Sequence, residues 1–272
     1  MIRWFKQLDG ILRGDATRLS ALKAGRIETP IGGLTVVTVF LGVTYGVCMG
    51  AYAVIRTGGT SNDAYMQLLA SAVKVPLLFF LTLGVTLPSL YVFNALVGSR
   101  LSVVSVMRLL VAMLGVTLAV LASLGPIVVF FSISTESYHF MVLLNVIVAA
   151  LSGFLGLAFL LRTLHRLTLS QIEMDRLTGT PPESADEFQG NDPVENVDDL
   201  ITTLDPVGHE TTGKARSVFR IWVIVFSLVG AQMSWVLRPF VGYPGMEFAW
   251  FRARESNFFL SVLETIATLF GA

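Results

Sequence analysis

Four polar residues stand inside long apolar stretches of this chain, and their chemistry needs an explanation. They are Lys74, Asn145, Gln232 and Glu264. Counted from the expected outer ends of their helices, the first three lie roughly 8 to 12 Å below the membrane boundary. Glu264 reaches the same level if the last segment re-enters the membrane. An unpaired charge facing lipid costs on the order of several kcal/mol. We therefore predict that the four residues meet inside a helical bundle, with Lys74 opposite Glu264 and the two amides completing the hydrogen bonds.

Such a cluster has two interpretations, and the sequence leaves both open. The first is a buried ion pair that only fixes the position of the last helix, as buried pairs often do. The second is a small outward-facing site that binds a lipid headgroup or an anion. Arg238 follows the apolar stretch that contains Gln232 and would lie at the outer rim. The candidate ligand-binding residues are Lys74, Asn145, Gln232, Arg238 and Glu264.

The remaining reactive side chains do not indicate an enzyme. The three histidines, His139, His165 and His209, are far apart and no spacing places them together. The chain has no HExxH, GxSxG or phosphate-loop pattern. Its single cysteine, Cys48, lies in the first apolar stretch, where it reads as a small packing residue. We expect no catalytic residue, no cofactor and no metal site.

Composition points to a membrane protein. Of the 272 residues 54% are hydrophobic and only 14% are charged, and the mean hydropathy is +0.71. Several apolar stretches exceed the length of about 18 residues at which a transmembrane helix is expected. The formal net charge is zero, so no electrostatic argument for nucleic-acid binding exists.

The expected fold is all-α, a polytopic bundle of about five transmembrane helices. A short C-terminal helix from residue 257 would be interfacial or half-inserted, because it is too short for a full span. Prolines at positions 76 and 88 should bend the second span. The predicted spans are residues 31–55, 68–97, 103–132, 140–161 and 218–240.

Four regions follow from these spans. Residues 1–30 form a basic amphipathic segment, which lies either on the membrane surface or on the protein itself. Residues 31–172 contain the first four spans. Residues 173–214 read as a disordered acidic linker, because acidic residues and prolines crowd a stretch of low apolar content. Residues 215–272 contain the fifth span and the aromatic C-terminal segment.

Small residues mark two helix-packing faces. Gly42, Gly46 and Gly50 repeat every four residues, which leaves one face of the first span without side chains. Gly230 and Ser234 give the same spacing in the fifth span. Both patterns predict close contact with another helix. The partner of the glycine face is either another helix of the chain or a second copy of the chain.

Loop charge predicts the orientation. Lys and Arg are concentrated in residues 1–30, in the turn between the second and third spans, and on both flanks of the acidic linker. The positive-inside rule places these parts in the cytoplasm. Arg238, Arg252 and Arg254 are exceptions, since they fall outside. A multi-pass protein of the bacterial inner membrane is expected.

Several polar landmarks carry a resemblance. These are VKVPLLFFLTLGVTLPSLYVFNALVGSRLS from Val73, VLLNV around Asn145, GAQMSWVLRPFVG from Gly230, and ESNFF from Glu255. Together they resemble a group of bacterial polytopic proteins that is broadly similar to the five-span Yip superfamily. In eukaryotes that superfamily implies membrane trafficking and binding of small GTPases, not catalysis. This chain lacks the Asp-Leu-Tyr-Gly-Pro signature of the eukaryotic members, so no functional residue is carried over.

Two functions remain in competition. The first is a non-catalytic membrane protein that acts as a scaffold, as an assembly component, or by binding a partner or lipid. The second is a transporter or channel for a small solute or lipid, because the prolines of the second span would permit a discontinuous helix. Besides the bilayer, the expected partners are another membrane protein or a second copy of the chain.

Overall fold

A computed structural model describes residues 8–10, 31–96, 103–178, 206–237, 247–251 and 257–270. Every regular element in these ranges is a helix, which confirms the predicted all-α bundle. The helices are α3 (Ile31–Arg56), α4 (Asn62–Leu96), α5 (Val103–Ser134), α6 (Tyr138–Thr178), α8 (Pro206–Leu237) and α9 (Phe258–Phe270).

Four of these helices, α3, α4, α5 and α6, are long and apolar enough to cross a membrane. Their apolar stretches are Gly32–Arg56, Asn62–Val92, Val106–Ser134 and Tyr138–Thr163. In α8, the stretch Ile221–Leu237 is apolar but shorter. The predicted fifth span ends at residue 240, outside the described residues, so it stays a prediction. The chain is a multi-pass helical membrane protein by these criteria.

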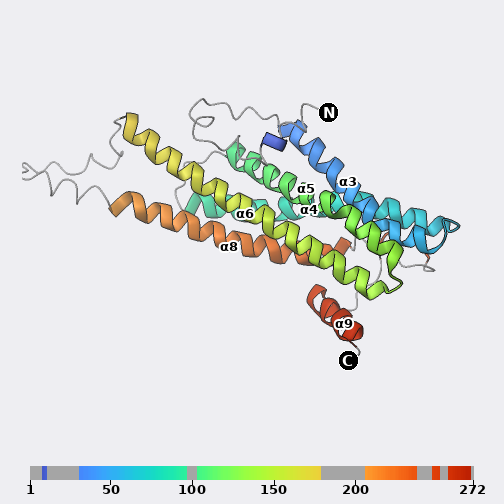
Figure 1. Cartoon of the computed structure of the whole chain (residues 1–272). Coiled ribbons are helices and arrows are strands. Elements are labelled where there is room, and N and C mark those ends of the chain that lie inside the picture. The colour runs from blue at the N-terminus through green and yellow to red at the C-terminus, as the bar shows by residue number, and fades with distance from the viewer. Residues whose placement is uncertain are drawn as a thin grey trace, which may run out of the picture.

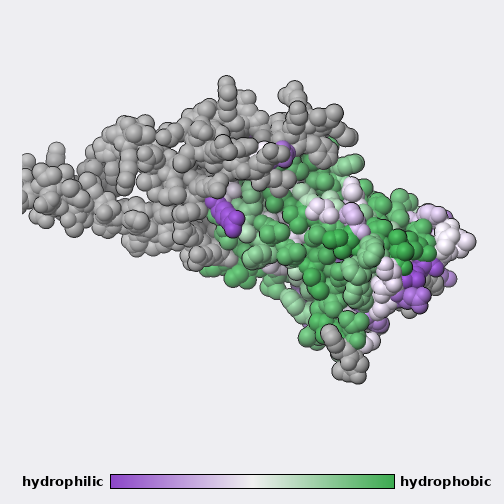
Figure 2. Space-filling view, in the orientation of Figure 1, coloured by the Kyte–Doolittle hydropathy of each residue, from purple (hydrophilic) through white to green (hydrophobic). Residues whose placement is uncertain are grey.

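The long helices form a bundle in which α3 lies between α4 and α5 (Figure 1). α3 packs against α4 and α5, and α5 also packs against α6. α8 closes the bundle by packing against α4 and, less extensively, against α6. α9 lies beside the bundle and packs against α6 and α8. Figure 2 shows a mainly hydrophobic surface over the middle of the bundle, with hydrophilic residues at the end where the α3–α4 and α5–α6 turns lie. Such a band suits a bilayer environment.

The glycine face of α3 contacts the backbone of α4. A Cβ atom added to Gly46 would lie 2.5 Å from the Ser71 carbonyl oxygen, and one at Gly50 would lie 2.8 Å from the Leu68 Cα. At Gly42 the Cβ would lie 3.0 Å from the Cβ of Pro76. The partner of this face is therefore another helix of the same chain. Glycine is required here because any side chain would separate the two backbones.

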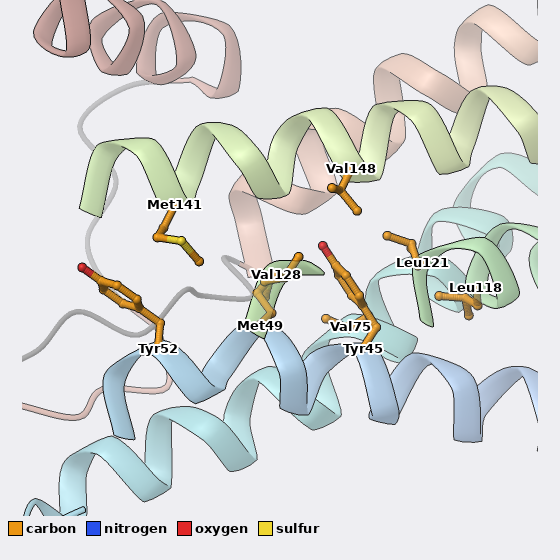
Figure 3. Packing of buried hydrophobic residues seen from close by; sticks show 9 residues of the cluster. All are labelled: Tyr45, Met49, Tyr52, Val75, Leu118, Leu121, Val128, Met141 and Val148. Carbon is orange, nitrogen blue, oxygen red and sulfur yellow. The ribbon is translucent and has the colours of Figure 1, made fainter. Parts of the chain in front are cut away.

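Three clusters of buried apolar residues hold the bundle together. Figure 3 shows one of them, in which Tyr45, Met49 and Tyr52 of α3 face Met141 and Val148 of α6, with residues of α4 and α5 between them. α8 contributes to a different cluster through Trp222 and Phe226.

The described part of the N-terminal segment lies on the protein. Leu8 is buried and packs with Leu34 and Val37 of α3 and with Val111 of α5. A Cβ added to Gly115 would lie 3.2 Å from Leu8 Cδ1, so the contact is close. Of the two alternatives left open for residues 1–30, docking on the protein therefore holds at Leu8.

The boundaries of the acidic linker need a correction. α6 continues to Thr178 and α8 begins at Pro206, so residues 173–178 and 206–214 are helical. The apolar stretch of α6 ends at Thr163, but the helix itself continues to Thr178. A change to polar composition therefore does not mark the end of this helix. The rest of the predicted linker lies outside the described residues.

Candidate functional site

Lys74 is the buried cation of α4. Its relative exposure is 3%, although its neighbours Val73 and Leu77 are exposed to the surroundings of the bundle. The residue lies twelve positions after Asn62, the first residue of α4, which corresponds to about 18 Å along the helix. A lysine at this depth needs compensation for the loss of its hydration, because a buried ammonium is otherwise unfavourable.

That compensation comes in part from residues 247–251, which we call the aromatic segment. The Lys74 ammonium donates a hydrogen bond of 2.6 Å to the backbone carbonyl of Trp250. The Lys74 Nζ also lies 5.9 Å from the centre of the Trp250 ring and 5.4 Å from that of Phe251. Both distances suit cation–π attraction, which is strongest where water is excluded. A cation, a carbonyl and two aromatic rings therefore form one site.

The aromatic segment lies on the surface. The Trp250 and Phe251 side chains are 51% and 69% exposed. Phe248 packs edge-to-face on Trp250, with ring centres 5.4 Å apart. The sequence already indicates an aromatic cluster here. Its contact with Lys74 joins positions 176 residues apart, and no local pattern predicts such a contact.

Glu264 does not serve as the partner of Lys74, so the predicted pairing is wrong. Glu264 is exposed in the middle of α9, beside the exposed Leu260 and Leu263. α9 packs against α6 and α8, whereas Lys74 belongs to α4. The ion pair found between described residues joins Arg56 to Glu136. The carbonyl of Trp250, rather than a carboxylate of α9, meets the ammonium because the aromatic segment covers this part of α4.

Asn145 is buried in α6, but its partner is a tyrosine. The Tyr45 hydroxyl donates to Asn145 Oδ1 at 2.9 Å, and Asn145 Nδ2 donates to the Met141 carbonyl at 2.8 Å. In Figure 3 the Tyr45 ring points from α3 toward α6. The predicted burial of Asn145 therefore holds, and its hydrogen bond with Tyr45 joins α3 to α6. Tyr45 was missed because a tyrosine in an apolar stretch reads as a packing residue.

The predicted packing residues of α8 contact α4 less closely than the glycines of α3 do. Gln232 and Ser234 are half-buried. A Cβ added to Gly230 would lie 3.5 Å from Thr82 Cγ2, an ordinary contact distance. The close helix approach predicted from Gly230 and Ser234 is thus not seen at Gly230. Arg238 lies outside the described residues.

A second polar cluster, which the sequence reasoning missed, joins α3 to the turn between α5 and α6. Arg56 Nη1 lies 3.4 Å from Glu136 Oε1, and its other terminal nitrogen donates to the Thr135 carbonyl. The Tyr52 hydroxyl donates to the Glu136 carbonyl at 2.9 Å. The Glu136 side chain is 92% exposed, so the ion pair itself contributes little. The sequence contains a usable signal, since Arg56 ends α3 and Glu136 lies between α5 and α6, at the same end of the bundle.

The buried threonine hydroxyls of α4, at Thr82 and Thr86, are satisfied locally. Thr82 Oγ1 donates to the Leu78 carbonyl at 2.7 Å, and Thr86 Oγ1 donates to the Thr82 carbonyl at 2.8 Å. Bonds of this kind are the usual way in which membrane helices accommodate threonine. These hydroxyls therefore do not by themselves indicate a polar path through the bundle.

No group of histidine, cysteine, aspartate or glutamate suited to a metal ion occurs within the described ranges. Comparison with protein-family models, with curated proteins and with solved structures finds no match. Function must therefore be argued from the geometry of this chain.

Proposed function

We propose that this chain is a non-catalytic membrane protein that binds a partner or a lipid through the Lys74 site. The observation that carries the proposal is the burial of the Lys74 ammonium beneath an exposed aromatic segment. Buried cations within membrane helices are costly, and they usually mark functional positions. An exposed aromatic pair beside such a cation supplies the apolar and polar contacts that recognition sites combine.

The alternative is a transporter or channel for a small solute or a lipid. The position of Lys74 in a helix that contains Pro76 supports it, because transporters place polar groups near interrupted helices. α4 nevertheless runs continuously through Pro76 and Pro88. The local satisfaction of Thr82 and Thr86 also gives the alternative less support.

Affinity purification from native membranes in mild detergent separates the two functions. The proposal predicts that the wild-type chain retains a defined protein or lipid and that Lys74→Met loses it. Arg56→Gln, which removes a cation from the α3–α4 end of the bundle, should retain it. Substrate-dependent flux in proteoliposomes, without retention of any component, would favour the transporter and contradict the binding function.

The proposal includes the membrane localisation and the orientation of the chain. We assign the chain to the bacterial inner membrane, with the N-terminus cytoplasmic and the Arg56 end of the bundle outside, on the strength of the loop charges. The Yip-like relationship likewise remains a proposal that rests on the sequence landmarks.

Labelling of single cysteines tests this orientation. Cys48→Ser gives a background without cysteine, because the chain has one cysteine. A cysteine at Ser61, in the turn between α3 and α4, should react with a membrane-impermeant maleimide in intact spheroplasts. A cysteine at Ser184 should react only after the membrane is opened. The reverse pattern would contradict the orientation.

A further inference from the structure

α6 and α8 meet in one buried cluster and extend from it toward the same end of the bundle. Leu160 of α6 and Trp222 of α8 are both fully buried in this cluster. Figure 1 shows the C-terminal part of α6 and the N-terminal part of α8 extending past the other helices at this end. Arg162 follows Leu160 by two positions, and Arg220 precedes Trp222 by two. One arginine of each helix therefore lies at a similar distance beyond the cluster.

Each of these arginines has a second arginine one helical turn further from the cluster. Arg166 follows Arg162 on α6, and Arg216 precedes Arg220 on α8, so both spacings are four residues. We call these two sets the arginine pairs. Residues at this spacing share one face of a helix, and like charges there repel each other. Neither pair has an acidic residue of its own helix within one turn, so an external anion would reduce the repulsion.

The arginine pairs continue exposed apolar faces of the two helices. On α6, Leu155 precedes Arg162 by seven positions, close to two turns, and its side chain is 43% exposed. Arg162 is exposed as well. On α8, Ile224 follows Arg220 by four positions, and its side chain is 67% exposed. An exposed apolar face that ends in cations matches a phospholipid, in which apolar chains extend from a charged phosphate.

Net positive charge is concentrated in the parts of α6 and α8 nearest to the cluster. Further from it, Glu173 and Asp175 of α6 and Glu210 of α8 introduce negative charge. An anion that approaches these helices is therefore attracted to the arginine pairs rather than to the helix ends. Guanidinium groups bind phosphate oxygens through two parallel hydrogen bonds. Clusters of Lys and Arg at a membrane surface attract anionic headgroups.

We infer that the arginine pairs of α6 and α8 bind the phosphate groups of anionic phospholipids. A bound phosphate reduces the repulsion within a pair, and the acyl chains of the lipid lie against the exposed apolar face next to it. The arginine pairs belong to α6 and α8, whereas the Lys74 site belongs to α4 and residues 247–251. Lipid binding at the arginine pairs is therefore separate from the proposed function and independent of it.

Native mass spectrometry of the full chain tests the binding. The protein is reconstituted in phosphatidylcholine nanodiscs with increasing phosphatidylglycerol and then released for analysis. The two pair variants are Arg162→Gln/Arg166→Gln and Arg216→Gln/Arg220→Gln. Each should lower the apparent affinity for phosphatidylglycerol about tenfold, because every cation near a membrane surface contributes to the attraction. An unchanged affinity in either pair variant would overturn the inference.

A matched control removes the same charge from other positions. Arg56 is the last residue of α3, and Arg176 lies near the last residue of α6. Arg56→Gln/Arg176→Gln should therefore bind phosphatidylglycerol as the wild type does. A loss in this control equal to that of the pair variants would mean that only net charge matters, and it would contradict a site at the arginine pairs.

Thermal unfolding in nanodiscs separates lipid binding from a purely structural role. In phosphatidylcholine alone, both pair variants should have midpoints equal to or above that of the wild type, because the substitutions remove like-charge repulsion. Phosphatidylglycerol should raise the midpoint of the wild type but not that of the pair variants, since a ligand stabilises the state that binds it. Stabilisation of all three proteins alike by phosphatidylglycerol would overturn the inference. Equal stabilisation of the wild type by inorganic phosphate would identify a soluble anion and overturn the assignment to a lipid.

A combined variant separates the arginine pairs from the Lys74 site. In a Lys74→Met background, removal of the α6 pair should lower the affinity for phosphatidylglycerol by the same factor as in the wild type, because distant sites contribute independently. No further loss in that background would assign the retained lipid to the Lys74 site and overturn the inference. Failure of the arginine pairs to bind lipid would leave the proposed function standing, since that function is tested by what Lys74→Met loses on purification.

Discussion

Gly46→Leu is expected to prevent close packing of α3 on α4 and to cause the largest loss of stability among single substitutions in this face. The added Cβ would lie 2.5 Å from the Ser71 carbonyl oxygen and 2.7 Å from the Ala72 Cα. Both atoms belong to the backbone of α4, so no flexible side chain can move to make room. Overpacking typically costs about 1 to 3 kcal/mol, and we expect the upper end of this range or more. The measurement is the thermal midpoint and the elution profile in detergent.

Gly84→Leu is the matched control for this prediction. Gly84 is exposed on α4, and a Cβ there meets no atom within 4 Å. Leucine also favours a helix over glycine by roughly 1 kcal/mol. The midpoint of Gly84→Leu should therefore equal or exceed that of the wild type. A wild-type midpoint for Gly46→Leu would mean that α3 and α4 do not approach as described.

Trp222→Ala should release α8 from the bundle. The Trp222 side chain is fully buried, and its ring lies 5.2 Å from that of Phe226. Its Nε1–H donates to the Thr86 carbonyl of α4 at 3.2 Å. Truncating a buried tryptophan to alanine costs about 3 to 5 kcal/mol, because a large cavity remains. Unfolding by increasing denaturant, monitored by circular dichroism, measures the loss.

Two further variants separate the contributions of packing and hydrogen bonding at this position. Trp222→Phe keeps most of the ring and removes the donor, so it should cost only about 1 kcal/mol. Phe154→Ala removes a large side chain that is 70% exposed on α6, and it should leave stability nearly unchanged. If Trp222→Ala lost no more stability than Phe154→Ala, the described packing of α8 on α4 would be contradicted.

Features that depend on spacing along one helix could be predicted from the sequence. The glycines at positions 42, 46 and 50 define a smooth face, and the structure shows a helix packed on it. Long apolar stretches predict the helices α3 to α6 for the same reason. The partner of the glycine face could not be predicted, because spacing in one helix carries no information about which helix approaches it.

The candidate site shows where such reasoning stops. The burial of Lys74 was predictable, since a charge in an apolar helix avoids lipid. The acceptor of the Lys74 hydrogen bond could not be predicted, because it is a backbone carbonyl. Every residue has such a carbonyl, so no residue type identifies it. The pairing of Glu264 with Lys74 rests only on their similar depth in the membrane. Depth does not predict which helices are neighbours, and α9 packs on α6 and α8 rather than on α4. Asn145 was placed inside correctly, but its partner Tyr45 is 100 residues away.

Site-specific photocrosslinking at the aromatic segment tests the central claim most directly, because that claim is recognition at the Lys74 site. Benzoylphenylalanine replaces Phe251 in living cells, and Phe154 of α6 serves as the control position. The two side chains are 69% and 70% exposed. We predict that position 251 yields a defined protein adduct or an enrichment of anionic phospholipid over position 154, and that Lys74→Met abolishes the difference. Identical adducts at both positions, unchanged by Lys74→Met, would contradict the account.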